Sequence, residues 1–98
     1  MKKENLISVT QFCKLYGVED SFVTALRDYD LIQLTTVKRT TCIDLQQLRK
    51  LEKLVHLHYE LDINIEGIDV IHHLLERMES MQQELLALRN KLTRFEES

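Results

Sequence analysis

Hydrophobic positions in the first third of the chain follow the spacing of two short helices. Ser8 and Gln11 form a capping-box start, and Gly17 supplies a stop. One face of the helix between them is apolar at positions i, i+3, i+4 and i+7, which are Val9, Phe12, Cys13 and Tyr16. The second helix follows an acidic start at Glu19 and Asp20, and its apolar residues are Phe22, Leu26 and Tyr29. Two short helices joined around a glycine predict a helix-turn-helix.

The pattern changes over residues 31–43 to a run rich in threonine and β-branched residues. We interpret it as a short two-stranded wing that turns near Lys38 and Arg39, although the Asn-Gly or Asp-Gly pair typical of such turns is missing. Asp44 with Gln47 is a second capping signature, which opens a helix through about Leu61. The residues that this helix is expected to bury are Leu48, Leu51, Leu54 and Val55.

A long last helix carries the clearest periodic signal. The segment Asp62-Ile63-Asn64 breaks the preceding helix, with Asn64 as the N-cap of a new helix that extends to about Phe95. Two sets of apolar residues repeat every seven positions, one three residues after the other: Ile71, Met78, Leu85 and Leu92, then Leu74, Met81, Leu88 and Phe95. These are the a and d positions of a coiled coil. We call these eight residues the seam.

The chain is therefore divided into a winged-helix head over residues 1–62 and a C-terminal helix over residues 63–98. The proximal apolar positions Ile65, Ile68, Ile71 and Leu75 are expected to pack on the head. A helix rises about 1.5 Å per residue, so the distal part extends beyond a head of this size and needs another partner. We expect it to form a homodimer through Met78, Met81, Leu85, Leu88, Leu92 and Phe95. Folding back onto the head is the alternative, and the orientation of the two helices stays open.

Composition restricts the function classes. With 98 residues, no proline and a formal net charge of −3, the chain has room for one compact domain plus an appendage, and its charge disfavours a partner bound mainly through phosphates. No apolar run is long enough to cross a bilayer, so we expect a cytoplasmic protein that binds no membrane. Cys13 and Cys42 lack metal-site spacing, and no phosphate loop or nucleophile arrangement occurs. We expect no enzyme activity, no cofactor and no metal.

The order of these elements, helix, helix, wing, helix and long C-terminal helix, resembles that of MerR-type winged-helix proteins. Three segments in order also resemble the chaperone modulator CbpM family over about residues 6–95. They are Val9-Thr10-Gln11-Phe12-Cys13 with Gly17-Val18, then Leu57-His58-Tyr59-Glu60-Leu61-Asp62-Ile63 leading to Gly67-Ile68-Asp69-Val70, and Leu88-Arg89-Asn90-Lys91-Leu92-Thr93-Arg94-Phe95. The resemblance implies a protein that binds the J-domain of a DnaJ-like, CbpA-type co-chaperone and inhibits its stimulation of Hsp70.

DNA binding, as in a MerR-like transcriptional regulator, is the alternative function, and the residues disfavour it. MerR regulators carry an arginine followed by aromatic residues on the second helix, where this chain has Thr24-Ala25-Leu26. Contacts to base edges and phosphates need long donors, which these positions lack. Residues 19–30 carry four acids against Arg27 alone. A dimerisation module unrelated to chaperones is a third possibility.

Four acidic residues lie near the junction of the third and last helices. J-domains present a basic second helix, so the resemblance implies an acidic surface on the modulator. Glu60, Asp62, Glu66 and Asp69 are the candidates for that surface, and we call them the acidic corner. Complementary charge there would set orientation and association rate. An ordinary solvated corner that favours the helix start through its dipole is the other interpretation.

Overall fold

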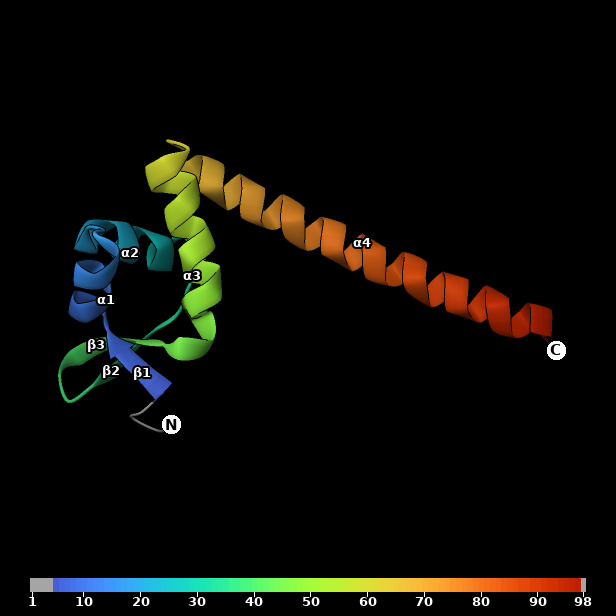
Figure 1. Cartoon of the computed structure of the whole chain (residues 1–98), viewed down its shortest axis with the longest axis horizontal. Helices are drawn as coiled ribbons and strands as arrows, with labels where there is room; N and C mark the ends of the chain where they lie inside the picture. The colour runs from blue at the N-terminus through green and yellow to red at the C-terminus, as the bar shows by residue number, and fades with distance from the viewer. Residues whose placement is uncertain (1–4, 98) are drawn as a thin grey trace.

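The computed structural model describes residues 5–97 of the chain as a small head from which one long helix projects (Figure 1). The elements in chain order are β1 (Leu6–Ser8), α1 (Val9–Tyr16), α2 (Asp20–Asp28), β2 (Leu34–Val37), β3 (Thr40–Asp44), the 3₁₀ turn η2 (Leu45–Gln47), α3 (Leu48–Val55), the π-helical turn η3 (His56–Glu60) and α4 (Ile65–Glu97). The prediction of a mainly α, winged helix-turn-helix fold with a hairpin wing and a long C-terminal helix is confirmed.

The helix-turn-helix begins and ends where local sequence predicts. The Ser8 hydroxyl accepts a hydrogen bond from the Gln11 backbone N–H at 3.1 Å, which satisfies one free donor of the first turn. Gly17 ends α1 in the left-handed conformation with φ of 65°. Glycine adopts this conformation without the steric cost that a Cβ brings. α2 then packs Phe22, Val23 and Leu26 into the core.

The wing is one edge of a three-stranded antiparallel sheet. β2 and β3 pair with Val37 opposite Thr40, and the turn between them consists of Lys38 and Arg39 at φ of 48° and 65°. The predicted position of the turn is confirmed, and two positive φ values are typical of the tight hairpin turns that favour glycine or asparagine. β1 pairs with the other side of β3, with Leu6 opposite Asp44. The sequence did not predict β1, because a three-residue strand is too short to show alternation.

The start of the third helix differs from a simple capping box. The Asp44 carboxylate accepts from the Gln46 N–H at 2.8 Å, but it caps the 3₁₀ turn η2 that precedes α3. The Gln47 side chain bonds instead to the backbone of Gln33, accepting from its N–H at 2.8 Å and donating to its carbonyl at 2.7 Å. Gln47 thus connects the wing to α3. On this helix Leu51 and Leu54 are buried, whereas Leu48 and Val55 are partly buried.

A π-helical turn and a break separate α3 from α4. The chain reverses at Asp62, whose φ is 57°, and the Asn64 side chain accepts from the Gly67 N–H at 2.8 Å, which confirms Asn64 as the cap. Within residues 65–97, Ile68 is the buried residue, and it joins the core of the head together with residues of α1, α2 and α3. Leu75 was expected to pack on the head, but it is 56% exposed. The burial of α4 against the head therefore ends before this residue.

Candidate protein-binding surfaces

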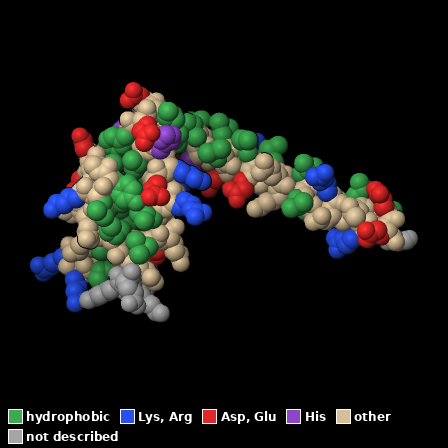
Figure 2. Space-filling model, viewed as in Figure 1, with side chains coloured by type: hydrophobic (Ala, Val, Ile, Leu, Met, Phe, Trp, Pro, Cys, Tyr) green, Lys and Arg blue, Asp and Glu red, His purple; other side chains and the backbone are tan. Residues whose placement is uncertain are grey.

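The seam residues beyond Ile71, which we call the distal seam, form an exposed apolar stripe on α4. Its exposed fractions run from 54% at Leu74 to 82% at Phe95, and the residues expected to dimerise, Met78, Met81, Leu85, Leu88, Leu92 and Phe95, all lie in this range. Green side chains follow α4 out to its end in the space-filling view (Figure 2). Large contiguous apolar patches on a protein surface mark interaction sites. Coiled-coil periodicity and exposure therefore coincide on the same residues.

The acidic corner lies across the break between η3 and α4. Glu60, Asp62 and Glu66 are exposed, and Asp69 is partly buried. Glu60 has a partner, because its carboxylate lies 3.0 Å from His56 Nδ1. The corner therefore offers three exposed carboxylates, with Asp69 at its inner edge.

Asp69 is held by a histidine one turn further along α4. His73 Nδ1 lies 2.7 Å from the Asp69 backbone carbonyl and 3.2 Å from Asp69 Oδ1. Oδ1 itself makes no hydrogen bond among the described residues. The contact with the backbone carbonyl, followed by the nearby carboxylates of Asp69 and Glu76, raises the pKa of His73 above its usual value. Protonated His73 offsets part of the negative charge on this side of the corner.

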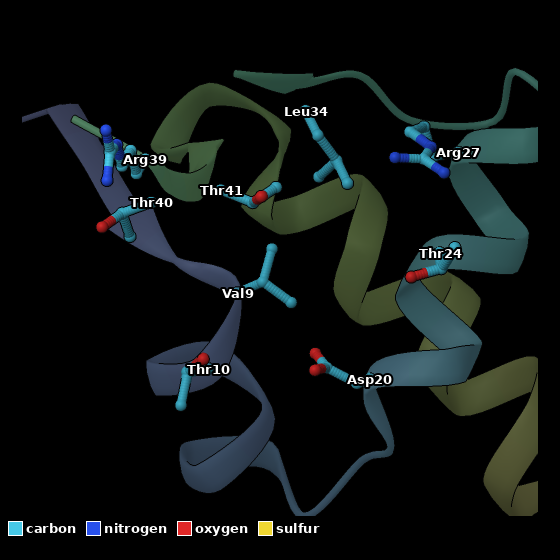
Figure 3. Close-up of a pocket in the computed structure, with 9 residues that line it drawn as sticks. All are labelled: Val9, Thr10, Asp20, Thr24, Arg27, Leu34, Arg39, Thr40 and Thr41. Atoms are coloured by element: carbon cyan, nitrogen blue, oxygen red, sulfur yellow. The ribbon is translucent and has the colours of Figure 1, made fainter. Parts of the chain in front are cut away.

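A polar pocket of about 410 Å³ lies between α2 and the wing (Figure 3). Its lining combines threonine hydroxyls with one carboxylate, two guanidinium groups and two apolar side chains. The lining residues are Val9, Thr10, Asp20, Thr24, Arg27, Leu34, Arg39, Thr40 and Thr41. The sequence did not predict this pocket, although the threonine-rich run over residues 35–41 supplies part of it.

Two charged residues that line this pocket, Arg27 and Asp20, also contact side chains outside its lining. Arg27 pairs with Asp28 at 3.1 Å, and Asp20 accepts a weak bond from the Cys13 thiol at 3.6 Å. Burial, with the charge and hydrogen bond of Asp20, raises the pKa of the Cys13 thiol. The exposed surface of α2 and its flanks presents Glu19, Asp20, Asp28 and Asp30. This face offers few of the cations that phosphate contacts require.

A comparison with known families assigns the chain. The family model described as "MerR HTH family regulatory protein" matches residues 7–90, which include the helix-turn-helix, the wing and most of α4. The chain belongs to the MerR family of helix-turn-helix regulatory proteins. Searches of curated proteins and of solved structures found no match to it. The expected MerR-type resemblance is thus confirmed at the level of the family.

Three observations concern metal ligands, membrane spans and cysteines in residues 5–97 of this MerR-family chain. No three histidine, cysteine or acidic side chains in this part of the chain come together as a metal site. No helix within the same residues has the length and apolar character to span a bilayer. Within the described part, Cys13 and Cys42 are both free thiols.

A groove of about 480 Å³ lies between α3 and α4 of this MerR-family chain. We call it the α3–α4 groove. Its apolar lining is Leu57, Ile71 and Leu75, and its polar rim is Arg49, Glu52, Lys53 and His56. The Glu52 carboxylate accepts a 2.6 Å hydrogen bond from the Tyr16 hydroxyl, and this contact raises the pKa of Tyr16. The rim carries the cations Arg49 and Lys53 beside the carboxylate of Glu52.

Proposed function

We propose that this MerR-family chain is a non-enzymatic chaperone modulator, similar to the CbpM family, that binds the J-domain of a DnaJ-like co-chaperone. It acts in the cytoplasm as a homodimer and needs no cofactor. By occupying the J-domain it inhibits the stimulation of Hsp70. The activity is binding rather than catalysis, so affinity and occupancy set its strength.

The observation that carries this proposal is the presence of two groups of exposed acidic residues, one on α2 and its flanks and one at the α3–α4 break. The α2 region presents Asp20, Asp28 and Asp30 to solvent, and the α3–α4 break presents the exposed acids of the acidic corner. A polyanion such as DNA is repelled by such surfaces, whereas a basic protein helix is attracted. The second helix of a J-domain has that basic character.

The acidic corner is the proposed docking site. Asp62 and Glu66 lie on either side of the Asn64 cap, and both are exposed to solvent. Glu60 and Asp69 extend the surface, each paired with a histidine that a cationic partner must displace or tolerate.

The exposure of the distal seam supports the homodimer in this proposal. The six residues from Met78 to Phe95 cover more than two heptads and are exposed on the single chain. Pairing with a second copy removes this apolar surface from water without a second kind of protein. Each dimer then presents two acidic corners, so one dimer binds two J-domains.

Titration of purified J-domain into the chain tests the docking site. Glu66→Lys is expected to weaken J-domain binding about ten-fold at low salt, because exposed charge pairs contribute about 0.2–1 kcal/mol each and reversal adds repulsion. Glu79→Lys is the matched control, since it makes the same charge change on an exposed residue of α4 further from the corner. The same two variants are compared in a J-domain-stimulated Hsp70 ATPase assay, where Glu66→Lys is expected to inhibit less.

Equal affinity of the two variants for the J-domain contradicts the acidic corner as the docking site. Absence of any J-domain binding by the unaltered chain contradicts the proposed function itself. Thermal unfolding of both variants controls for the helix dipole, because Glu66 also lies in the first turn of α4.

DNA binding remains a second candidate because of the pocket between α2 and the wing. Arg27 and Arg39 flank threonine hydroxyls there, and such groups can contact phosphates. A gel-shift assay at physiological salt tests it. Retention of DNA without capture of a J-domain reverses the order of the two proposals.

A further inference from the structure

One face of α2 lines the pocket between this helix and the wing (Figure 3). Asp20, Thr24 and Arg27 are spaced i, i+4 and i+7, so the helix places them on the same side. All three are exposed, and the Asp20 carboxylate and the Thr24 hydroxyl point from α2 into the pocket (Figure 3). The Cα atoms of Asp20 and Arg27 lie about 10 Å apart along the helix axis, from a rise of about 1.5 Å per residue. This wall therefore carries a negative charge at one end and a positive charge at the other.

The protein leaves hydrogen-bonding capacity on each charged group of the pocket. Within the part of the chain that the structure describes, Asp20 has no cationic partner, and its contact is the weakly donating Cys13 thiol at 3.6 Å. Arg39, in the wing turn, forms no ion pair among the same residues. Arg27 bonds to Asp28 through Nε and Nη2 at 3.4 and 3.1 Å, which leaves its Nη1 atom for another acceptor. All three groups can therefore contact a ligand.

The signs of these charges indicate the class of ligand. Two guanidinium groups and one carboxylate complement a molecule that carries two negative groups and one positive group. A phosphate presents negative charge only, and it would bring that charge against Asp20. An ammonium group pairs with Asp20 instead, through a charge-assisted hydrogen bond. The pocket thus favours a zwitterion over a phosphate.

The rest of the lining fits the carbon chain and the carboxylates of such a molecule. Val9 and Leu34 form its apolar part, and the hydroxyls of Thr10, Thr40 and Thr41 can donate to a carboxylate. Val9 and Thr10 also begin α1, and the N-terminus of a helix favours an anion. The volume of about 410 Å³ lies at the lower end of the range of small-molecule pockets, which is about 300–1,000 Å³. The pocket therefore admits a molecule of amino-acid size.

We propose that this pocket binds a free acidic α-amino acid. The ammonium group of the ligand pairs with Asp20, and its two carboxylates pair with Arg27 and Arg39. Its methylene groups lie on Val9 and Leu34. These side chains come from α1, α2 and the wing, so only the folded head brings them together. The site shares no residue with the acidic corner and does not depend on the binding of a J-domain.

An NMR titration of the full chain with L-glutamate tests the ligand class. Saturable binding is expected, with the largest amide shifts at Thr24 and Thr41. Glutarate lacks the ammonium group and L-glutamine lacks the second carboxylate. Each is expected to bind at least about five-fold more weakly, because each loses a hydrogen bond between charged groups. Absence of L-glutamate binding, or equal affinity for L-glutamate and either analogue, overturns the proposal.

A pair of variants tests the assigned contacts. Asp20→Asn is expected to weaken L-glutamate binding at least about five-fold but not the binding of glutarate, which has no ammonium group to lose. Asp30→Asn is the matched control, because Asp30 is exposed, lies outside the pocket and has a φ of 59° that asparagine tolerates. Retained glutarate binding also shows that the Asp20→Asn chain is folded.

The wing side of the pocket is tested in the same way. Arg39→Gln is expected to weaken both L-glutamate and glutarate, whereas Lys38→Gln, at the neighbouring turn residue outside the lining, is expected to change neither. Equal loss of both ligands in Asp20→Asn overturns the assigned contacts. Control variants that bind as weakly as the pocket variants also overturn them.

Discussion

Replacement of two seam leucines is the most direct test of the dimer. Leu85 and Leu88 lie near the middle of the distal seam and are 58% and 62% exposed in the single chain. Leu85→Asp with Leu88→Asp replaces both by charged residues that a dimer interface must desolvate. We expect a folded monomer, because Ile68 and the core of the head are untouched.

The expected magnitude follows from these exposures. Full burial of a leucine contributes about 1.5–3 kcal/mol, and roughly three-fifths of each side chain remains to be buried, so each leucine contributes about 1–2 kcal/mol. Four leucines in a dimer together contribute about 4–8 kcal/mol. A micromolar dimer has about 8 kcal/mol of association free energy in total. Loss of this contribution weakens such a dimer at least about a thousand-fold.

Sedimentation velocity over a range of concentrations measures the effect. Leu86→Asp is the matched control, because Leu86 is the next residue on α4, is 56% exposed and lies outside the seam. The control is expected to remain dimeric. A double variant that still dimerises like the unaltered chain, or a Leu86→Asp chain that is equally monomeric, refutes the assignment of the seam.

Three further predictions concern the head and its junction with α4. Lys38→Asn with Arg39→Gly is expected to stabilise the protein by about 1 kcal/mol, since both residues have positive φ in the wing turn, and thermal unfolding measures the gain. Ile68→Ala is expected to cost about 2–5 kcal/mol in urea unfolding because Ile68 is fully buried, whereas Val70→Ala, at an exposed position, changes stability by less than about 0.5 kcal/mol. The folded state raises the pKa of His73, so its contribution to stability is present at low pH and is lost as pH rises through that raised pKa. The stability difference between the unaltered chain and His73→Gln is therefore expected to grow as pH falls from about 8 to 5, and an NMR titration of His73 should give a midpoint above the usual histidine value.

Local features of the fold could be predicted because their causes lie within a few residues. Ser8, Gly17 and Asn64 cap or end helices through contacts with neighbours no more than a few positions away. The wing turn at Lys38 and Arg39 followed from the boundaries of the threonine-rich run, even without the usual turn residues. Hydrophobic periodicity and caps are local properties, and one sequence is sufficient to show them.

Features that join distant segments could not be predicted in this way. β1 depends on pairing with β3, which lies more than thirty residues later in the chain. Gln47 was expected to form a capping box with Asp44, but its side chain bonds to the backbone of Gln33 instead. The partial burial of Asp69 depends on how α4 leaves the head. Such contacts compete with local preferences, and tertiary packing decides between them.

The sequence by itself determined the order of the elements and the seam of α4, because a helix repeats its faces at a fixed spacing wherever it lies. It also located the acids of the acidic corner along the chain. Only the tertiary structure decided that Leu75 stays exposed, that Ile71 joins the seam to the α3–α4 groove, and that Arg49 and Lys53 stand on the rim of that groove. The reason is geometric: a groove between two helices is set by the angle at which they cross, and that angle comes from packing in the core of the head.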